Sequence, residues 1–160
     1  MLYSKLAETY EKLEATTKKL EKRDILAELY KKCSADELGI VVKLTFSLGV
    51  DLGIASQLML QVIRKTYGLN EGEVLRKFKG TGDLGLTAEY FSEHRKQSLL
   101  GRKSLDIEHV FNNILKLPRI TGKGSQDKKI SLVSELLSSA SAKEAKYITK
   151  TILGEMRIGV

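Results

Sequence analysis

The last part of the chain decides the fold, and residues 121–160 read TGKGSQDKKISLVSELLSSASAKEAKYITKTILGEMRIGV. Apolar residues recur there at helical spacing, which predicts a helix with one buried face formed by Ile130, Val133, Leu136, Leu137 and Ala140. Ser141 and Glu144 form a Ser-x-x-Glu capping box, so a second helix is expected to begin at this point. The residues of that helix that should face inward are Ala145, Ile148 and Ile152. Together the two periodic stretches predict a helical hairpin.

Two glycine-bearing segments flank the hairpin and supply the candidate binding residues. The first helix is expected to begin at about Ser125, with the Ser125 hydroxyl as its N-cap. Glycine before a helix start lets backbone amides approach an anion closely, and the helix dipole favours negative charge at that end. The residues around this point are Gly122, Lys123, Gly124, Lys128 and Lys129. The segment after the hairpin contributes Gly154, Arg157 and Gly159.

A row of lysines lies on another face of the second helix, where Lys143, Lys146 and Lys150 follow i, i+3, i+7 spacing. We expect this row to be exposed and to point one way. A solvated helix face is the commoner role of any single charge row, and an isolated Gly-x-Gly is commoner in ordinary turns than at phosphates. The glycines and the helix start beside the row favour an anion-binding surface, and both interpretations stay open.

Length and composition indicate one soluble domain. A chain of 160 residues with 42% hydrophobic and 29% charged residues can bury roughly 70% of its unfolded surface in a single core. The formal charge of +7 suits a polyanionic partner, although many soluble proteins share such an excess. Cys33 is the only cysteine, which excludes an internal disulfide and is typical of a reducing compartment. No apolar run approaches a membrane span and no signal peptide is evident, so we expect a cytoplasmic protein, or a nuclear one in a eukaryote.

Helical periodicity continues through the rest of the chain, and no stretch alternates with period two. The expected helices cover about residues 2–13, 16–32, 34–48, 55–67, 70–78 and 86–91, with a seventh from residue 107 to just before Pro118. Their inward stripes account for nearly all the large apolar residues. We therefore expect an all-α fold, a compact array of antiparallel helical hairpins. Two related halves, divided in the basic loop at residues 94–103, are an open alternative.

The start of the second expected helix carries four cations, Lys18, Lys19, Lys22 and Arg23. The helix dipole disfavours positive charge at that end. A solvated first turn is the simple interpretation, but four such charges together suggest that a phosphate pairs with them.

The residues give little support to metal or covalent chemistry. His94 and His109 are the only histidines, and neither has a Cys pair or a carboxylate at ligand spacing, so we expect no zinc site. No Gly-x-Ser-x-Gly motif is present, and one cysteine with two distant histidines is a poor basis for a nucleophile. We therefore expect no catalytic, cofactor-binding or metal-ligating residues in this chain.

Several motifs taken together resemble a known family. They are GSQDKKI at residues 124–130, EAKYI at 144–148 and LGEMRIGV at 153–160, preceded by TTKKL at 16–20, ILAEL at 25–29, DLGI at 51–54, GDLG at 82–85 and AE at 88–89. In this order they resemble the N-terminal DNA-binding domain of ATP-dependent DNA ligases, most closely the archaeal and eukaryotic replicative type. The resemblance covers nearly the whole chain, and the combination is more specific than any single piece.

The resemblance implies a noncatalytic helical domain that grips duplex DNA across the minor groove on both sides of a nick, mainly through phosphates and sugars. Carried over residue by residue, one backbone-binding turn would consist of Gly124, Ser125, Lys128 and Lys129. Its partner would consist of Gly154, Arg157 and Gly159. Lys19 falls where relatives commonly have Arg, so a bidentate phosphate contact would become a single one. The lysine row adds Lys146 and Lys150 as candidate DNA contacts.

The resemblance also implies what these residues do not do alone. Ligases adenylate a lysine in a Lys-x-Asp-Gly motif, using ATP and Mg²⁺, and this tetrapeptide is absent here. We therefore expect residues 1–160 to be a single domain, a fragment of a larger ligase without the nucleotidyltransferase and OB-fold domains, and inactive alone. The expected partners are nicked double-stranded DNA, the missing domains of the same chain and, as in some relatives, a sliding clamp, but no membrane. The alternatives are a helical protein-interaction scaffold and a self-sufficient enzyme.

Overall fold

A computed structural model describes residues 1–95 and 103–160, and within these residues all regular structure is helical. The helices are α1 (Tyr3–Glu14), α2 (Lys19–Lys31), α3 (Ala35–Thr45), α4 (Ser56–Tyr67), α5 (Glu71–Thr81), α6 (Leu84–Glu93), α7 (Ile107–Lys116), the short 3₁₀ helix η1 (Leu117–Arg119), α8 (Ser125–Ser138) and α9 (Ala142–Leu153). A single isolated β-bridge joins Leu2 to Asp106 in this part of the chain. The predicted all-α class is confirmed.

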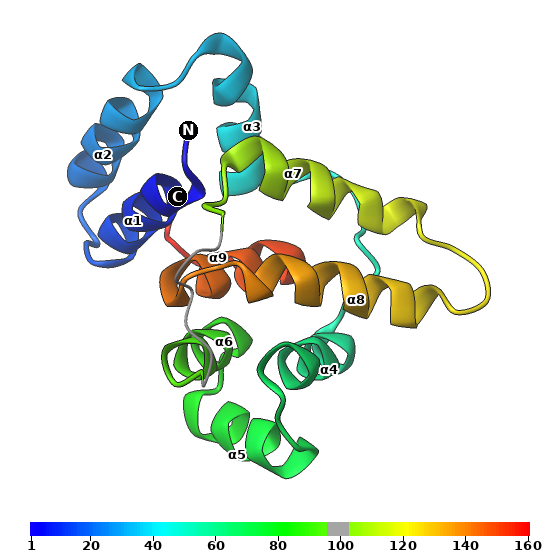
Figure 1. Ribbon diagram of the computed structural model, residues 1–160. Helices are drawn as coiled ribbons and strands as arrows, with labels where there is room; N and C mark the ends of the chain where they lie inside the picture. Colours follow the sequence, from blue (N-terminus) through cyan, green and yellow to red (C-terminus); the bar gives the residue numbers. More distant parts are fainter. Residues whose placement is uncertain (96–102) are drawn as a thin grey trace.

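The central element is α9. Every residue of α9 from Glu144 to Ile152 is buried, and the helix packs against α1, α6 and α8. Figure 1 shows α8 and α9 side by side in the middle of the molecule, with α7 on one side and α4 and α6 on the other. The predicted hairpin is therefore present. The expected inward residues of both helices are buried, but burial of α9 is not confined to one face.

Local hydrogen bonding explains where most of the helices begin. The capping boxes at Ser34 and Ser141 both form, with Glu37 and Glu144 as the returning carboxylates. Side chains also cap three further helices, α5, α6 and α7, through Asn70, Asp83 and Asp106.

The expected cap of α8 is wrong, and the helix expected from residue 16 begins at Lys19. The N-cap of α8 is Gly124, whose φ of 75° turns the chain so that Ser125 becomes the first helical residue and makes no capping bond. The N-cap of α2 is Lys18, which makes no side-chain cap either. Thr16 instead accepts a hydrogen bond from the Lys18 amide and donates one to Glu21.

The glycine-rich stretch at residues 80–85 interrupts the helices less than expected. Helix α5 continues through Thr81, and α6 already includes Gly85, so the break consists of Gly82 and Asp83 alone. Gly85 lies where α6 meets α9, because a Cβ at that position would be 2.7 Å from the Lys150 Cγ and 3.0 Å from the Lys146 carbonyl oxygen. The absence of a side chain therefore sets how closely the two helices approach.

Gly85→Ala is expected to lower the free energy of unfolding by about 1–2 kcal/mol, because overpacking outweighs the helix propensity that Ala adds. The matched control is Gly80→Ala, since Gly80 is also helical and no neighbouring atom lies within 4 Å of an added Cβ. This control should stabilise the protein by about 0.5–1 kcal/mol. Urea unfolding of both variants tests the difference, and a stabilising effect at Gly85 would contradict the close approach.

Two further expectations concern the division into related halves and the absence of a membrane span. The proposed division into related halves falls at residues 94–103, and residues 96–102 lie outside the described residues. Among the residues described, none of the helices combines the length and apolar character needed to cross a bilayer.

Candidate nucleic-acid interface

The first candidate segment is the turn that leads into α8. Gly122 and Gly124 have φ values of 85° and 75°, and no atom lies within 4 Å of a Cβ added to either, so the backbone there is open. The Ser125 amide donates to the Gly122 carbonyl, which closes the turn. Lys128 is exposed on the first turn of α8, and Ser125 is half-buried. The main chain can therefore approach a flat anionic surface at this point, with a cation beside it.

Lys129 joins this segment to a distant loop. Its ammonium lies against Gly53, where a Cβ would be 2.4 Å from the Lys129 Nζ. Gly53 has a φ of 65°, and its amide donates to the Asp51 carboxylate in a tight turn. The DLGI motif at residues 51–54 thus packs beside the start of α8, which its position in the sequence did not reveal.

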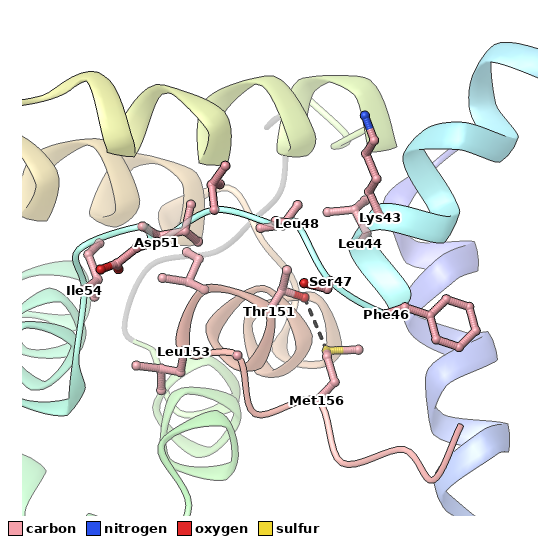
Figure 2. A pocket seen from close by; sticks show the side chains of 14 residues that line it. Lys43, Leu44, Phe46, Ser47, Leu48, Asp51, Ile54, Thr151, Leu153 and Met156 are labelled. Carbon is pink, nitrogen blue, oxygen red and sulfur yellow. Dashed lines mark hydrogen bonds between the residues drawn. The ribbon is translucent and has the colours of Figure 1, made fainter.

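The loop at residues 46–54 also reaches the second candidate segment. A pocket of about 290 Å³ is lined on one side by this loop, including Phe46 and Asp51, and on the other by the end of α9, including Gly154 and Met156. Figure 2 shows the loop passing beside Leu153 and Met156, with a hydrogen bond between the Thr151 hydroxyl and the Met156 sulfur. The two glycine-bearing segments therefore border one connected region of the molecule.

The second segment makes a sharp turn after α9. Gly154 ends the helix in the left-handed conformation with a φ of 69°, and the Glu155 amide donates to the Lys150 carbonyl. Arg157 has a φ of 47° and is the one non-glycine residue with positive φ in the described part of the chain. Ile158 is only 3% exposed, whereas Arg157 and Gly159 face solvent. The buried isoleucine anchors the turn and leaves the arginine free to meet a ligand.

Helix α2 lies beside this second segment. A groove of about 510 Å³ is lined by residues from both, which are Lys19, Lys22, Arg23, Leu26, Ala27, Tyr30, Gly159 and Val160. The structure therefore brings Lys19 to the C-terminal segment, as a shared DNA surface requires. Lys19 is exposed and has no hydrogen-bond or ion-pair partner among the described residues.

The other three cations at the start of α2 have partners within the protein. Lys18 pairs with Glu21 at 3.1 Å, and Arg23 pairs with Asp24 at 2.9 Å. Lys22 donates to the backbone carbonyl of Ile158 at 2.5 Å. The idea that all four charges lack a partner within the protein is therefore wrong for three of them, because carboxylates and a carbonyl serve as acceptors.

The expected exposed lysine row is also wrong, since only Lys143 is exposed. Lys146 and Lys150 are 8% and 7% exposed, and their ammonium groups bind the Glu14 carboxylate of α1 at 2.9 and 3.0 Å. Lys150 also lies 3.7 Å from Asp83. Helices α1 and α6 cover this face of α9, so these two lysines hold helices together rather than presenting charge to a ligand.

The environment of Glu14 affects its protonation. Burial raises the pKa of the Glu14 carboxyl, but the hydrogen bonds and charges of Lys146 and Lys150 outweigh burial and hold that pKa below its usual value. Sequence reasoning missed this residue because nothing near it in the chain marks its partners.

The histidines make ordinary local contacts. His94 stacks on Tyr90 and hydrogen-bonds the Tyr90 carbonyl through Nδ1, whereas the His109 Nε2 lies 3.3 Å from the Asn113 amide. Within residues 1–95 and 103–160, no three His, Cys, Asp or Glu side chains converge as metal ligands would.

Comparison with known proteins gives a consistent result over the whole chain. A family model described as DNA ligase N terminus matches residues 2–160. The chain is 35% identical over 166 residues to a DNA ligase of Methanothermobacter thermautotrophicus, covering 100% of this chain and 30% of that protein. It is 34% identical to DNA ligase 2 of Thermofilum pendens (99% and 28% covered) and 32% identical to a DNA ligase of Pyrobaculum islandicum (100% and 29% covered). The chain thus spans about 30% of the length of these relatives.

Proposed function

The chain belongs to the DNA ligase N-terminus family, and from that premise we propose that it binds duplex DNA around a nick without regard to base sequence. In this role it is the noncatalytic DNA-binding domain of an ATP-dependent ligase that seals 3′-hydroxyl and 5′-phosphate ends in replication and repair.

One observation carries the proposal: two glycine-bearing turns, each with an exposed cation, border the same loop at residues 46–54. The cations are Lys128 and Arg157, and Lys19 adds a third across the groove from Gly159. Open glycine backbone with flanking cations suits a sugar-phosphate backbone, which carries charge but little sequence information. The proposed contact residues are Lys19, Gly124, Ser125, Lys128, Lys129, Gly154, Arg157 and Gly159. Lys146 and Lys150 are left out because Glu14 already pairs with them.

The remaining parts of the reaction are assigned to a longer protein. The sequence has no Lys-x-Asp-Gly motif, so we propose that adenylation with ATP and Mg²⁺ takes place in further domains of the same ligase. Residues 1–160 would then form one domain that is inactive alone and meets those domains on the DNA, with a sliding clamp as a further candidate partner. Because its proposed substrate is DNA, we propose that the protein acts in the cytoplasm, or in the nucleus of a eukaryote.

The test of this function is the salt dependence of binding to nicked duplexes of two unrelated sequences, measured by gel shift. If the four proposed cations each neutralise one phosphate, log K should fall with log salt at a slope of about −3.6, and equally for both sequences. A rise from 50 to 200 mM salt should then weaken binding roughly 150-fold. No affinity at 50 mM salt, or a strong preference for one sequence, would refute the proposal. An intact duplex in parallel shows whether the nick itself is recognised.

A second candidate function, a protein-interaction scaffold, has one observation in its favour. Leu38 and Val42 on α3 and Phe46 directly after it follow one another at every fourth position and are 37%, 39% and 52% exposed. The expectation that inward stripes take up nearly all large apolar residues is therefore wrong on α3. Binding to a protein partner that is indifferent to both salt and DNA would favour this function.

A further inference from the structure

Lys22 makes a contact that differs from those of the other cations on α2. It is half-buried, and its ammonium donates to the backbone carbonyl of Ile158, which is 136 residues further along the chain. The next residue, Gly159, has a φ of 73°, and a Cβ there would lie 2.3 Å from the Lys22 Nζ. Glycine at this position therefore leaves the space that the ammonium occupies.

The turn that Lys22 contacts needs support. Arg157 adopts a φ of 47°, a conformation that side chains other than glycine rarely take and that persists only where neighbouring structure holds it. The Ile158 side chain supplies apolar anchorage within the core. In the described part of the chain, the bond from Lys22 is the one polar contact from a distant element to residues 157–159.

We propose that Lys22 is a positioning residue that holds the Arg157 turn against α2, rather than a phosphate ligand. Its ammonium fixes the Ile158 carbonyl, so that Arg157 stands at a defined place relative to Lys19 and both meet one stretch of DNA backbone. This inference rests on the proposed DNA binding for its effect on affinity. The geometry of the turn itself does not depend on DNA.

The experiment compares Lys22→Met with Lys19→Met, a matched loss of one charge on the same helix. Each variant is made alone and with Arg157→Ala, and affinity for nicked duplex is measured at low salt. Each single change should weaken binding about tenfold, as expected for the loss of one charged contact. The double variant Lys22→Met with Arg157→Ala should bind DNA at most about twofold more weakly than the weaker-binding of its two single variants. Both changes remove the same contact, so their losses should not multiply. Lys19→Met with Arg157→Ala should show the product of the two losses.

A second measurement uses the protein without DNA. Amide hydrogen exchange in residues 155–160 should become faster in Lys22→Met and stay unchanged in Lys19→Met, with melting temperatures recorded for both. In Gly159→Ala the added methyl group occupies the space of the Lys22 ammonium, so this variant should show the same faster exchange. It replaces Lys22→Met in the experiment if Lys22→Met fails to fold.

The outcomes separate the two proposals. Multiplicative losses for Lys22→Met and Arg157→Ala, or unchanged exchange at residues 155–160, would overturn the positioning role. An unmodified protein that binds no DNA would refute the proposed function instead, and the exchange measurement would still decide whether Lys22 holds the turn.

Discussion

Replacing Glu14 by Ala is expected to lower the free energy of unfolding at pH 7 by about 3 kcal/mol, within the range for breaking a buried ion pair. The change leaves the Lys146 and Lys150 ammonium groups buried without the carboxylate that both of them bind. The lower end of the range applies because the Glu14 side chain is itself 25% exposed, so water can partly replace it. Urea unfolding measures the effect.

The control for this prediction is Glu11→Ala, three residues earlier on the same helix. Glu11 pairs with Lys143 at 2.6 Å, but both side chains are about half exposed. Such surface pairs contribute roughly 0–1 kcal/mol, so the control should stay near the unmodified protein. A similar loss of stability from Glu14→Ala and Glu11→Ala would show that the burial of Lys146 and Lys150 beside Glu14 does not cause the effect.

The ion pairs of Glu14 with Lys146 and Lys150 also predict that the folded protein loses stability in acid. The pKa of Glu14 is lower in the folded protein than in the unfolded chain, so its contribution to stability is complete above the unfolded value of about 4.3. As the pH falls through the folded pKa, the carboxylate is protonated and this contribution is lost. Glu14→Gln has no carboxyl to protonate, so the stability difference between it and the unmodified protein should shrink between about pH 5 and pH 3. A constant difference over that range would contradict the assignment.

Lys128→Ala combined with Arg157→Ala is expected to weaken DNA binding about 100-fold at low salt, if each charged contact contributes about 1.5 kcal/mol. The slope of log K against log salt should become shallower by about 2, because two fewer phosphates are neutralised. The two cations stand on separate turns, so their losses should multiply rather than overlap. Gel shifts between 50 and 200 mM salt provide both values.

The control for the double variant removes the same charge elsewhere. Lys5→Ala with Lys116→Ala takes two exposed cations from α1 and α7, outside the proposed contact set. This control should bind with nearly the same slope as the unmodified protein. Equal losses in both double variants would mean that net charge, rather than the two glycine-bearing turns, attracts DNA.

Much of the fold was predictable because its signals are local. A capping box joins residues three positions apart, and helical periodicity repeats within four, so Ser34, Ser141 and the buried stripe of α8 could be read from the sequence. Errors arose where a local rule has two solutions. Gly124 and Ser125 can each stand at a helix start, and the left-handed glycine takes the N-cap position.

The candidate site was predictable as a set of residues and not as an arrangement. The motifs pointed to both glycine-bearing turns and to Lys19, and they included residues 51–54, but they did not show that the loop at residues 46–54 lies between the turns. The exposure of single apolar residues was equally hidden, since Val41 and Leu44 are buried whereas Val42, between them on α3, is 39% exposed.

By itself, the sequence determined the helical class, most helix starts, the hairpin of α8 and α9, and the family. Only the tertiary structure decided which lysines are available to a ligand. Lys146 meets Glu14 across 132 residues, and Lys22 meets Ile158 across 136. A lysine row on a helix looks the same in sequence whether water or a buried carboxylate faces it. Helix packing brings that acceptor into place, and a charge removed from water is stable only beside such a partner.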